Sequence, residues 1–254
     1  MKKRVVYYTD ELNDDFSGVK RDTLTIDGEY VYIKKNIFWK ISAWIVRRIF
    51  VIPFAYVYMK IKFRHKVIGK EKLKDCKHRG YFMYSNHTLM AGDAFIPNII
   101  SRKKVYTVVH PDNISIKFVG EILKMSGAIP TPSTISATKN FVSAVEKLSE
   151  NNVIQIYPEA HVWPYYTGIR KFKSTSFKYP CKLNSPVYVL TNTFKKRKFS
   201  KTPQVVSYID GPFYPEEGTQ KEQKLASLVY ETMGKRSKNN NYEVIQYIKR
   251  ENND

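Results

Sequence analysis

The feature that most constrains the fold is an alternation of short apolar runs with segments of helical spacing, which begins at Tyr81. Short β-branched and aromatic runs favour strands, and apolar residues three or four apart favour helices. Strands separated by helices are typical of an α/β domain with a mostly parallel central sheet flanked by helices. We predict strands at Tyr81–Ser85, Val105–Val109, Val153–Tyr157, Val187–Thr191 and Val205–Ile209, and helices at Ile114–Met125, Ala137–Ser149 and Gln220–Lys235.

One long apolar segment, Ile37–Ile61, precedes this region. Four cations interrupt it, and its longest uncharged stretch is the 11 residues Ile49–Met59. A membrane-spanning helix needs about 20 apolar residues, and Pro53 would also kink this one. Interleaved aromatic, aliphatic and cationic side chains suit a helix or helical hairpin that contacts the membrane interface. The alternative is a buried helical hairpin packed on the core.

The charge balance predicts anionic partners. Lys and Arg number 43 against 23 Asp and Glu, a formal net charge of +20. Such a chain is attracted to an anionic membrane surface, to phosphate-bearing substrates or to nucleic acid. The 19 Tyr and 14 Phe tilt the choice toward a membrane interface only slightly, since they also stack on bases. Cys76 and Cys181 have no metal or disulfide spacing and suit a reducing compartment.

Two predicted strands end in residues with reactive side chains. Asn86-His87 follows the first strand, and Pro158-Glu159 follows Tyr157. In α/β sheets, ligands bind beyond the carboxyl ends of the strands. A histidine with a carboxylate six positions on, here Asp93, can form a base and its orienting partner. The alternative for such a pair alone is a helix-capping histidine and a solvated aspartate.

Several motifs then appear in a familiar order. Asn86-His87 followed by Asp93 resembles the first signature of the glycerolipid acyltransferases, the 1-acylglycerol-3-phosphate (lysophospholipid) acyltransferase family. The later blocks resemble its Phe-Pro-Glu-Gly, Phe-Lys-x-Gly-x-Phe and Pro-Val-x-Pro motifs at Ile156–Glu159, Phe172–Phe177 and Ser185–Val189. The agreement in order and spacing covers Ile37–Asp210. Each block is weak alone, and the ordered set is specific.

The resemblance implies roles for individual residues. His87 would deprotonate the acceptor hydroxyl, Asp93 would orient it, and Asn86 would support the pair. Glu159 would help to hold the acceptor side of the site. We expect the acceptor and its phosphate to be bound by Glu159 together with three basic residues that follow it, namely Arg170, Lys171 and Lys173. A solvated basic face is the alternative for those three.

The chain departs from the family pattern in three places. Five residues, Thr88–Gly92, separate His87 from Asp93 where the family usually has four, and we expect Gly92 to absorb the extra residue as a backbone irregularity. Ala160-His161-Val162 stands where Gly-Thr-Arg usually follows the glutamate, and Gly127–Ile129 runs into Pro130 rather than an arginine. Two arginines expected at the acceptor phosphate are therefore absent from their usual places.

The resemblance predicts an enzyme, an O-acyltransferase that acts by direct transfer. The acyl donor would be an acyl carrier protein or coenzyme A thioester, and the acceptor a lysophosphatidate-like glycerolipid. We expect no metal, since His161 has no ligand set with His87 and Asp93 at a recognisable spacing. Direct transfer needs no tightly bound cofactor. We expect no nucleic-acid partner, because a basic binding module has no need of a His-Asp pair and a Pro-Glu loop at adjacent strand ends. The alternatives are a related acyltransferase with a glycolipid or amino-acid lipid acceptor, and a non-catalytic basic protein that binds membrane or nucleic acid.

We divide the chain into four parts. Residues 1–36 form an N-terminal extension, mostly loop, with one hairpin at the alternating run Glu29–Ile33. Residues 37–62 form the membrane-contact helices, and 63–236 the acyltransferase α/β domain. Residues 237–254 form a polar tail with a weak helical pattern at Tyr242–Ile248. The expected location is the cytoplasmic face of a membrane.

Overall fold

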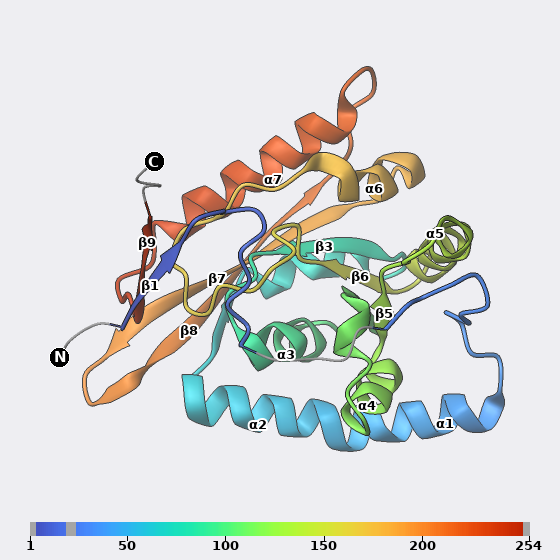
Figure 1. Cartoon of the computed structure of the whole chain (residues 1–254), viewed down its shortest axis with the longest axis horizontal. Coiled ribbons are helices and arrows are strands. Elements are labelled where there is room, and N and C mark those ends of the chain that lie inside the picture. Colours follow the sequence, from blue (N-terminus) through green and yellow to red (C-terminus); the bar gives the residue numbers. More distant parts are fainter. Residues whose placement is uncertain (1–3, 19–23, 251–254) are drawn as a thin grey trace.

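The computed structural model describes residues 4–18 and 24–250 and is built around a seven-stranded sheet (Figure 1). The strand order is β2-β8-β7-β3-β6-β4-β5, and every neighbouring pair is parallel except β7 with β8. The strands are β2 (Lys66–Ile68), β3 (Tyr81–Ser85), β4 (Val105–Val109), β5 (Ala128–Pro130), β6 (Val153–Ile156), β7 (Val187–Arg197) and β8 (Ser200–Phe213). The predicted α/β architecture is confirmed.

Helices cover both faces of this sheet (Figure 1). Alternate residues of β3 face opposite sides, so Phe82 and Tyr84 enter one apolar core and Tyr81 and Met83 the other. The first core is closed by α5 (Ile135–Ser149), α6 (Lys178–Leu183) and α7 (Lys221–Ser237), and the second by α2 (Ile52–Phe63) and α3 (Met90–Ile100). The central strand β3 is buried on both sides, which holds its carboxyl end rigidly.

The apolar segment is one continuous helix, Ile37–Phe63, and not a hairpin. It consists of α1 (Ile37–Ile45), a π-type segment (Val46–Val51) and α2. The Asn36 side chain caps its start by accepting from the Trp39 N–H at 3.1 Å. Pro53 lies in the first turn of α2, directly after the wider π-type turns, so the helix continues through it.

The two ends of the described chain pair with each other, contrary to the prediction. Strand β1 (Arg4–Tyr8) lies parallel to β9 (Ile245–Lys249), so the helical pattern predicted at Tyr242–Ile248 is wrong. An isolated helix of seven residues is only marginally stable. Pairing with β1 instead satisfies the backbone N–H and C=O groups of this segment with hydrogen bonds. The hairpin predicted at Glu29–Ile33 is also wrong. Its aromatic side chains pack instead, with Tyr32 edge-on to Phe141 of α5.

Other predicted elements differ mainly at their boundaries. The helix predicted from Ile114 begins only at Val119, as α4 (Val119–Ser126), after a short 3₁₀ turn at Pro111–Asn113. Strands β7 and β8 are longer than predicted and form an antiparallel hairpin. Their outer ends carry many lysines, which conceal the strand pattern in the sequence.

Candidate active site

The central feature of the site is a hydrogen bond between His87 and Asp93. His87 follows the carboxyl end of β3, and Asp93 lies in the first turn of α3. The Nδ1 atom of His87 donates to Oδ2 of Asp93 at 2.7 Å. The His87 side chain is 23% exposed and that of Asp93 only 2%. Nδ1 therefore carries the proton, and Nε2 is left to accept one.

The five-residue spacing is accommodated just before α3 rather than at Gly92. Leu89 has an extended backbone, with φ −128° and ψ 105°, and its N–H donates to Asp93 Oδ2 at 2.9 Å. Gly92 has no left-handed backbone and lies within α3. The glycine lets the Leu89 side chain pack closely against the backbone of α3. A Cβ at this position would lie only 2.9 Å from the Cβ of Leu89, which is too close. The expectation of a backbone irregularity at Gly92 is therefore wrong.

Tyr157 is a residue of the site whose role the sequence did not reveal. Its ring stacks on the His87 imidazole with centroids 4.5 Å apart and planes at 27°. Its hydroxyl donates to the backbone carbonyl of Asp93. Burial raises the pKa of Tyr157 well above its usual value, so the hydroxyl stays a neutral donor. Tyr157 thus holds both members of the pair from one side.

Glu159 lies at the end of the neighbouring strand β6 and ties the two strand ends together. Its carboxylate accepts from the backbone N–H of His87 and from the backbone N–H of Arg170, each at 3.2 Å. Burial raises the pKa of Glu159, and the nearby Arg170 charge opposes that shift. The carboxylate points to the backbone of His87, so its observed contacts are with the protein.

Arg170 is placed differently from its predicted role at an acceptor phosphate. Its side chain is 0% exposed, and Nη2 lies 3.3 Å from Oε2 of Glu159. The same nitrogen donates to the carbonyl of His161, and the guanidinium lies 4.9 Å from the Trp163 ring centroid. A buried guanidinium with these partners is not accessible to a headgroup. Arg170 is therefore a buried partner of Glu159 in this structure.

The other predicted phosphate ligands do not join the His87 site. Lys171 and Lys173 are exposed. Lys171 lines a cavity of about 440 Å³ between the loop that follows Arg170 and α7, together with Phe172 and Tyr230. The contact of Lys171 and Lys173 with an acceptor phosphate stays a prediction.

Asn86 secures the segment that carries His87. Its Nδ2 atom donates to the backbone carbonyl of Asn192 at 3.0 Å, and the Asn192 N–H donates back to Oδ1 of Asn86 at 2.8 Å. Asn192 belongs to β7, the strand on the other side of β3. The two bonds continue the strand pairing past the end of β3. The role of Asn86 in supporting catalysis stays a prediction.

The two ends of the chain cover the loop beyond Glu159. Trp163 donates from its backbone N–H to the carbonyl of His87 at 3.1 Å and from Nε1 to the carbonyl of Asp14 at 2.7 Å. Its ring stacks on Tyr247 of the β9 strand at 4.9 Å. No local sequence pattern indicates this contact, because it joins residues that are far apart in the chain.

The comparisons with known proteins agree with this geometry. A family model described as Acyltransferase matches residues 64–193, which include every member of the site from Asn86 to Arg170. The chain belongs to the acyltransferase family. A search of curated proteins gave no match.

The fold of this acyltransferase is similar to that of PlsC from Thermotoga maritima, a 1-acyl-sn-glycerophosphate (LPA) acyltransferase solved by crystallography. The TM-score is 0.56 and the identity 16%, over 79% of this chain and 87% of that chain. At this identity the likeness concerns the fold. It extends beyond the family match, since the shared region is larger than residues 64–193.

The arrangement in the acyltransferase is suited to proton transfer. A partly exposed imidazole with a fixed tautomer lies at the carboxyl edge of the sheet, where substrates reach α/β enzymes. Both cysteines are buried, at 1% for Cys76 and 5% for Cys181. Within the described residues no group of three or more His, Cys, Asp and Glu side chains could hold a metal ion.

Proposed function

We propose that the enzyme transfers a fatty acyl group from a thioester donor to the hydroxyl of a lysophosphatidate-like glycerolipid. The observation that carries the proposal is the 2.7 Å bond from His87 Nδ1 to Asp93 Oδ2, with Nε2 on the partly exposed side of the ring. The family and the fold support acyl transfer generally. The glycerolipid acceptor follows from the motif resemblance and the likeness to PlsC.

The proposed reaction is a direct transfer. Nε2 of His87 takes the proton from the acceptor hydroxyl as its oxygen attacks the thioester carbonyl. The tetrahedral intermediate collapses with cleavage of the carbon–sulfur bond, and the proton passes from His87 to the departing thiolate. Asp93 keeps the imidazole in one tautomer and stabilises its positive charge. An acyl-enzyme is not required, since neither buried cysteine is placed as a nucleophile.

Glu159 and Arg170 are assigned to positioning. Together they hold the His87 backbone against the end of β6 through the bonds described above. The acceptor phosphate is then left to exposed cations, and Lys171 and Lys173 remain our candidates. The burial of Arg170 also favours keeping one alternative, a glycolipid or amino-acid lipid acceptor.

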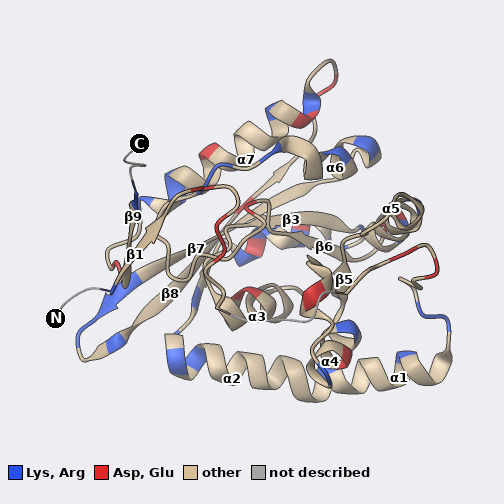
Figure 2. Cartoon of the chain, viewed as in Figure 1, with Lys and Arg blue, Asp and Glu red and all other residues tan. Residues whose placement is uncertain are grey.

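The long helix is proposed to dock the enzyme on a membrane. It is long and apolar enough to cross one, by length and composition. Side chains at Ala43, Ala55, Met59 and Phe63 are buried and pack along one face of this helix onto the domain. The opposite face is apolar and exposed, with Phe38, Ile41, Trp44, Ile49, Phe50, Phe54, Val57 and Ile61. Most of the helix is drawn in the colour of uncharged residues in Figure 2. A helix lying in the interface of the cytoplasmic leaflet fits both faces.

Helix α4 extends the same apolar surface. It packs beside α1 and the π-type segment, and its first turn exposes Phe118, Val119 and Ile122. Phe118 is 76% exposed. Large exposed apolar patches mark interaction surfaces rather than solvated ones.

The test is a panel of donors and acceptors with products identified by mass spectrometry. Acyl carrier protein and coenzyme A thioesters are each offered with lysophosphatidate, monoacylglycerol, a glycolipid and an amino-acid lipid. Acylated lysophosphatidate as the main product supports the proposal. Preference for another acceptor would overturn the glycerolipid assignment, and salt-dependent DNA binding without thioester consumption would overturn the enzyme assignment.

A further inference from the structure

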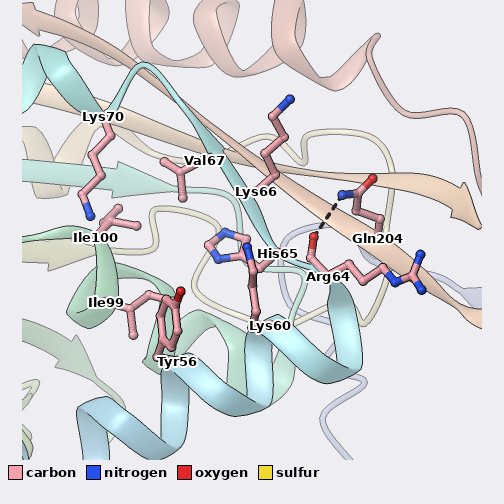
Figure 3. Close-up of a pocket in the computed structure, with 10 residues that line it drawn as sticks. All are labelled: Tyr56, Lys60, Arg64, His65, Lys66, Val67, Lys70, Ile99, Ile100 and Gln204. Carbon is pink, nitrogen blue, oxygen red and sulfur yellow. Dashed lines mark hydrogen bonds between the residues drawn. The ribbon is translucent and has the colours of Figure 1, made fainter.

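A second cavity, of about 460 Å³, lies between α2, α3, β2 and β8 (Figure 3). Five of its ten lining residues are basic, namely Lys60, Arg64, His65, Lys66 and Lys70. In Figure 3 the Lys60 side chain lies beside His65, and the Arg64 and Lys66 side chains extend outward. The four cations are exposed and His65 is buried. The motif resemblance gave these residues no role.

Among residues 4–18 and 24–250, no acidic side chain is paired with the cations of this cavity. Within the described residues none of the four forms an ion pair, and no acidic side chain lines the cavity. The acidic residue of the adjoining strand, Asp210, is already paired with Lys72 and Arg236. Like charges gathered without a counter-ion repel one another, and an anion relieves that repulsion.

The wall of the cavity is fixed by buried hydrogen bonds. The Nε2 atom of His65 lies 2.8 Å from the hydroxyl of Ser207, which donates to Oδ1 of Asn192 at 2.6 Å. Burial, together with the positive charges of Lys60 and Lys70, lowers the pKa of His65 to about 4. His65 therefore contributes a neutral imidazole to a site whose charge comes from the surrounding cations.

The cavity opens beside the exposed face of the long helix. Tyr56 and Lys60 are four residues apart and so share one side of α2, and Arg64 directly follows the last residue of that helix. The adjacent Val57 and Ile61 are 51% and 73% exposed. A charged group in the cavity would thus have an apolar strip next to it. A lipid has this combination of anionic head and apolar chains, and a soluble phosphate compound lacks the chains.

We propose that this cavity, lined by Lys60, Arg64, Lys66 and Lys70, binds the phosphate headgroup of an anionic phospholipid while the acyl chains lie along Val57 and Ile61. The site is separate from the His87 site and sets the orientation of the enzyme on the membrane. The inference rests on the proposed membrane placement of the helix and involves no acyl transfer. A binding experiment therefore tests it apart from catalysis.

The first experiment compares two triple variants that remove equal charge. Lys60→Gln, Arg64→Gln and Lys70→Gln remove three of the four cationic charges of the cavity. The control variant, Lys139→Gln with Lys147→Gln and Lys235→Gln, removes three exposed lysines from α5 and α7. Sedimentation with phosphatidylcholine vesicles, with and without phosphatidylglycerol, measures the partition coefficient. We expect the cavity variant to lose at least about tenfold of its preference for anionic vesicles, and the control less than about twofold. Equal losses would overturn the proposal.

The second experiment separates a headgroup site from diffuse attraction. Monomeric dihexanoyl-phosphatidylglycerol is titrated into the protein by calorimetry, beside dihexanoyl-phosphatidylcholine and inorganic phosphate. Saturable 1:1 binding of the anionic lipid, at least about tenfold tighter than phosphate, is expected and should disappear in the cavity variant. Gln204→Trp, which narrows the cavity without changing charge, should weaken it as well. Binding that survives in the cavity variant, or phosphate binding as tightly as the lipid, would refute the assignment.

Discussion

Nδ1 of His87 and Oδ2 of Asp93 lie 2.7 Å apart although five residues separate them. The extra residue is taken up by the extended backbone of Leu89, whose N–H donates to the same carboxylate oxygen. Asp93 therefore receives two donors in the first turn of α3, where the helix dipole also favours negative charge. A pair held in this way is fixed before substrate arrives.

The first prediction concerns Asp93. Asp93→Asn keeps the size of the side chain but removes the charge that stabilises protonated His87. We expect kcat to fall by about 10²- to 10⁴-fold with little change in the KM of either substrate. Steady-state kinetics measures both constants. Asp75→Asn, on an exposed turn, is the matched control and should retain full kcat; a similar loss in both variants would argue against the pair.

The second prediction concerns Tyr157. Tyr157→Phe keeps the ring stacked on His87 and removes only the hydroxyl that donates to Asp93. The loss of one hydrogen bond is worth about 0.5–1.5 kcal/mol, so we expect a several-fold fall in kcat and unchanged KM. Tyr157→Leu, which also removes the ring, should lower kcat further. Tyr214→Phe, at an exposed site, is the control and should keep the wild-type kcat. An identical kcat in wild type, Tyr157→Phe and Tyr157→Leu would show that Tyr157 does not position the pair.

Local patterns in the sequence were sufficient to predict the central strands and the placement of His87 and Glu159 at their ends. Strand β3 is a run of apolar residues buried on both sides, and such a run stands out in a sequence. The pairing of β1 with β9, and the contact of Trp163 with Asp14, join distant residues and leave no local pattern. The burial of Arg170 was not predicted for a related reason. An arginine that pairs with a buried carboxylate cannot be told from one that binds phosphate by the sequence alone.

The third prediction concerns the buried pair of Glu159 and Arg170. Arg170→Met leaves the carboxylate buried without its cation, which costs about 3–5 kcal/mol of unfolding free energy. The double variant Glu159→Gln with Arg170→Met removes the uncompensated charge and should recover part of that loss. Denaturant unfolding completes the double-mutant cycle. The exposed Lys171→Met should change stability by less than about 0.5 kcal/mol. Additive losses in the double variant would contradict the assigned pairing.

The fourth prediction concerns His65 and pH. Burial lowers its folded-state pKa to about 4 from an ordinary 6.5, so the folded state favours the neutral ring. The contribution of the neutral ring to the free energy of unfolding is fully present above pH 6.5. It is lost as the pH falls toward 4, and the total loss is about 3 kcal/mol. Unfolding free energy measured at a series of pH values should fall more steeply in wild type than in His65→Gln. His110→Gln, at an exposed site, should keep the wild-type slope; equal slopes in all three proteins would refute the shift.

His87 is proposed as the general base of acyl transfer. Thiol release from an acyl thioester, measured with and without lysophosphatidate, tests this role in wild type and His87→Ala, with His78→Ala as an exposed control. We predict acceptor-dependent release in wild type and in the control. In His87→Ala we predict a fall of at least about 10²-fold with an unchanged unfolding midpoint. Acceptor-dependent release at the wild-type rate in a folded His87→Ala protein would contradict it.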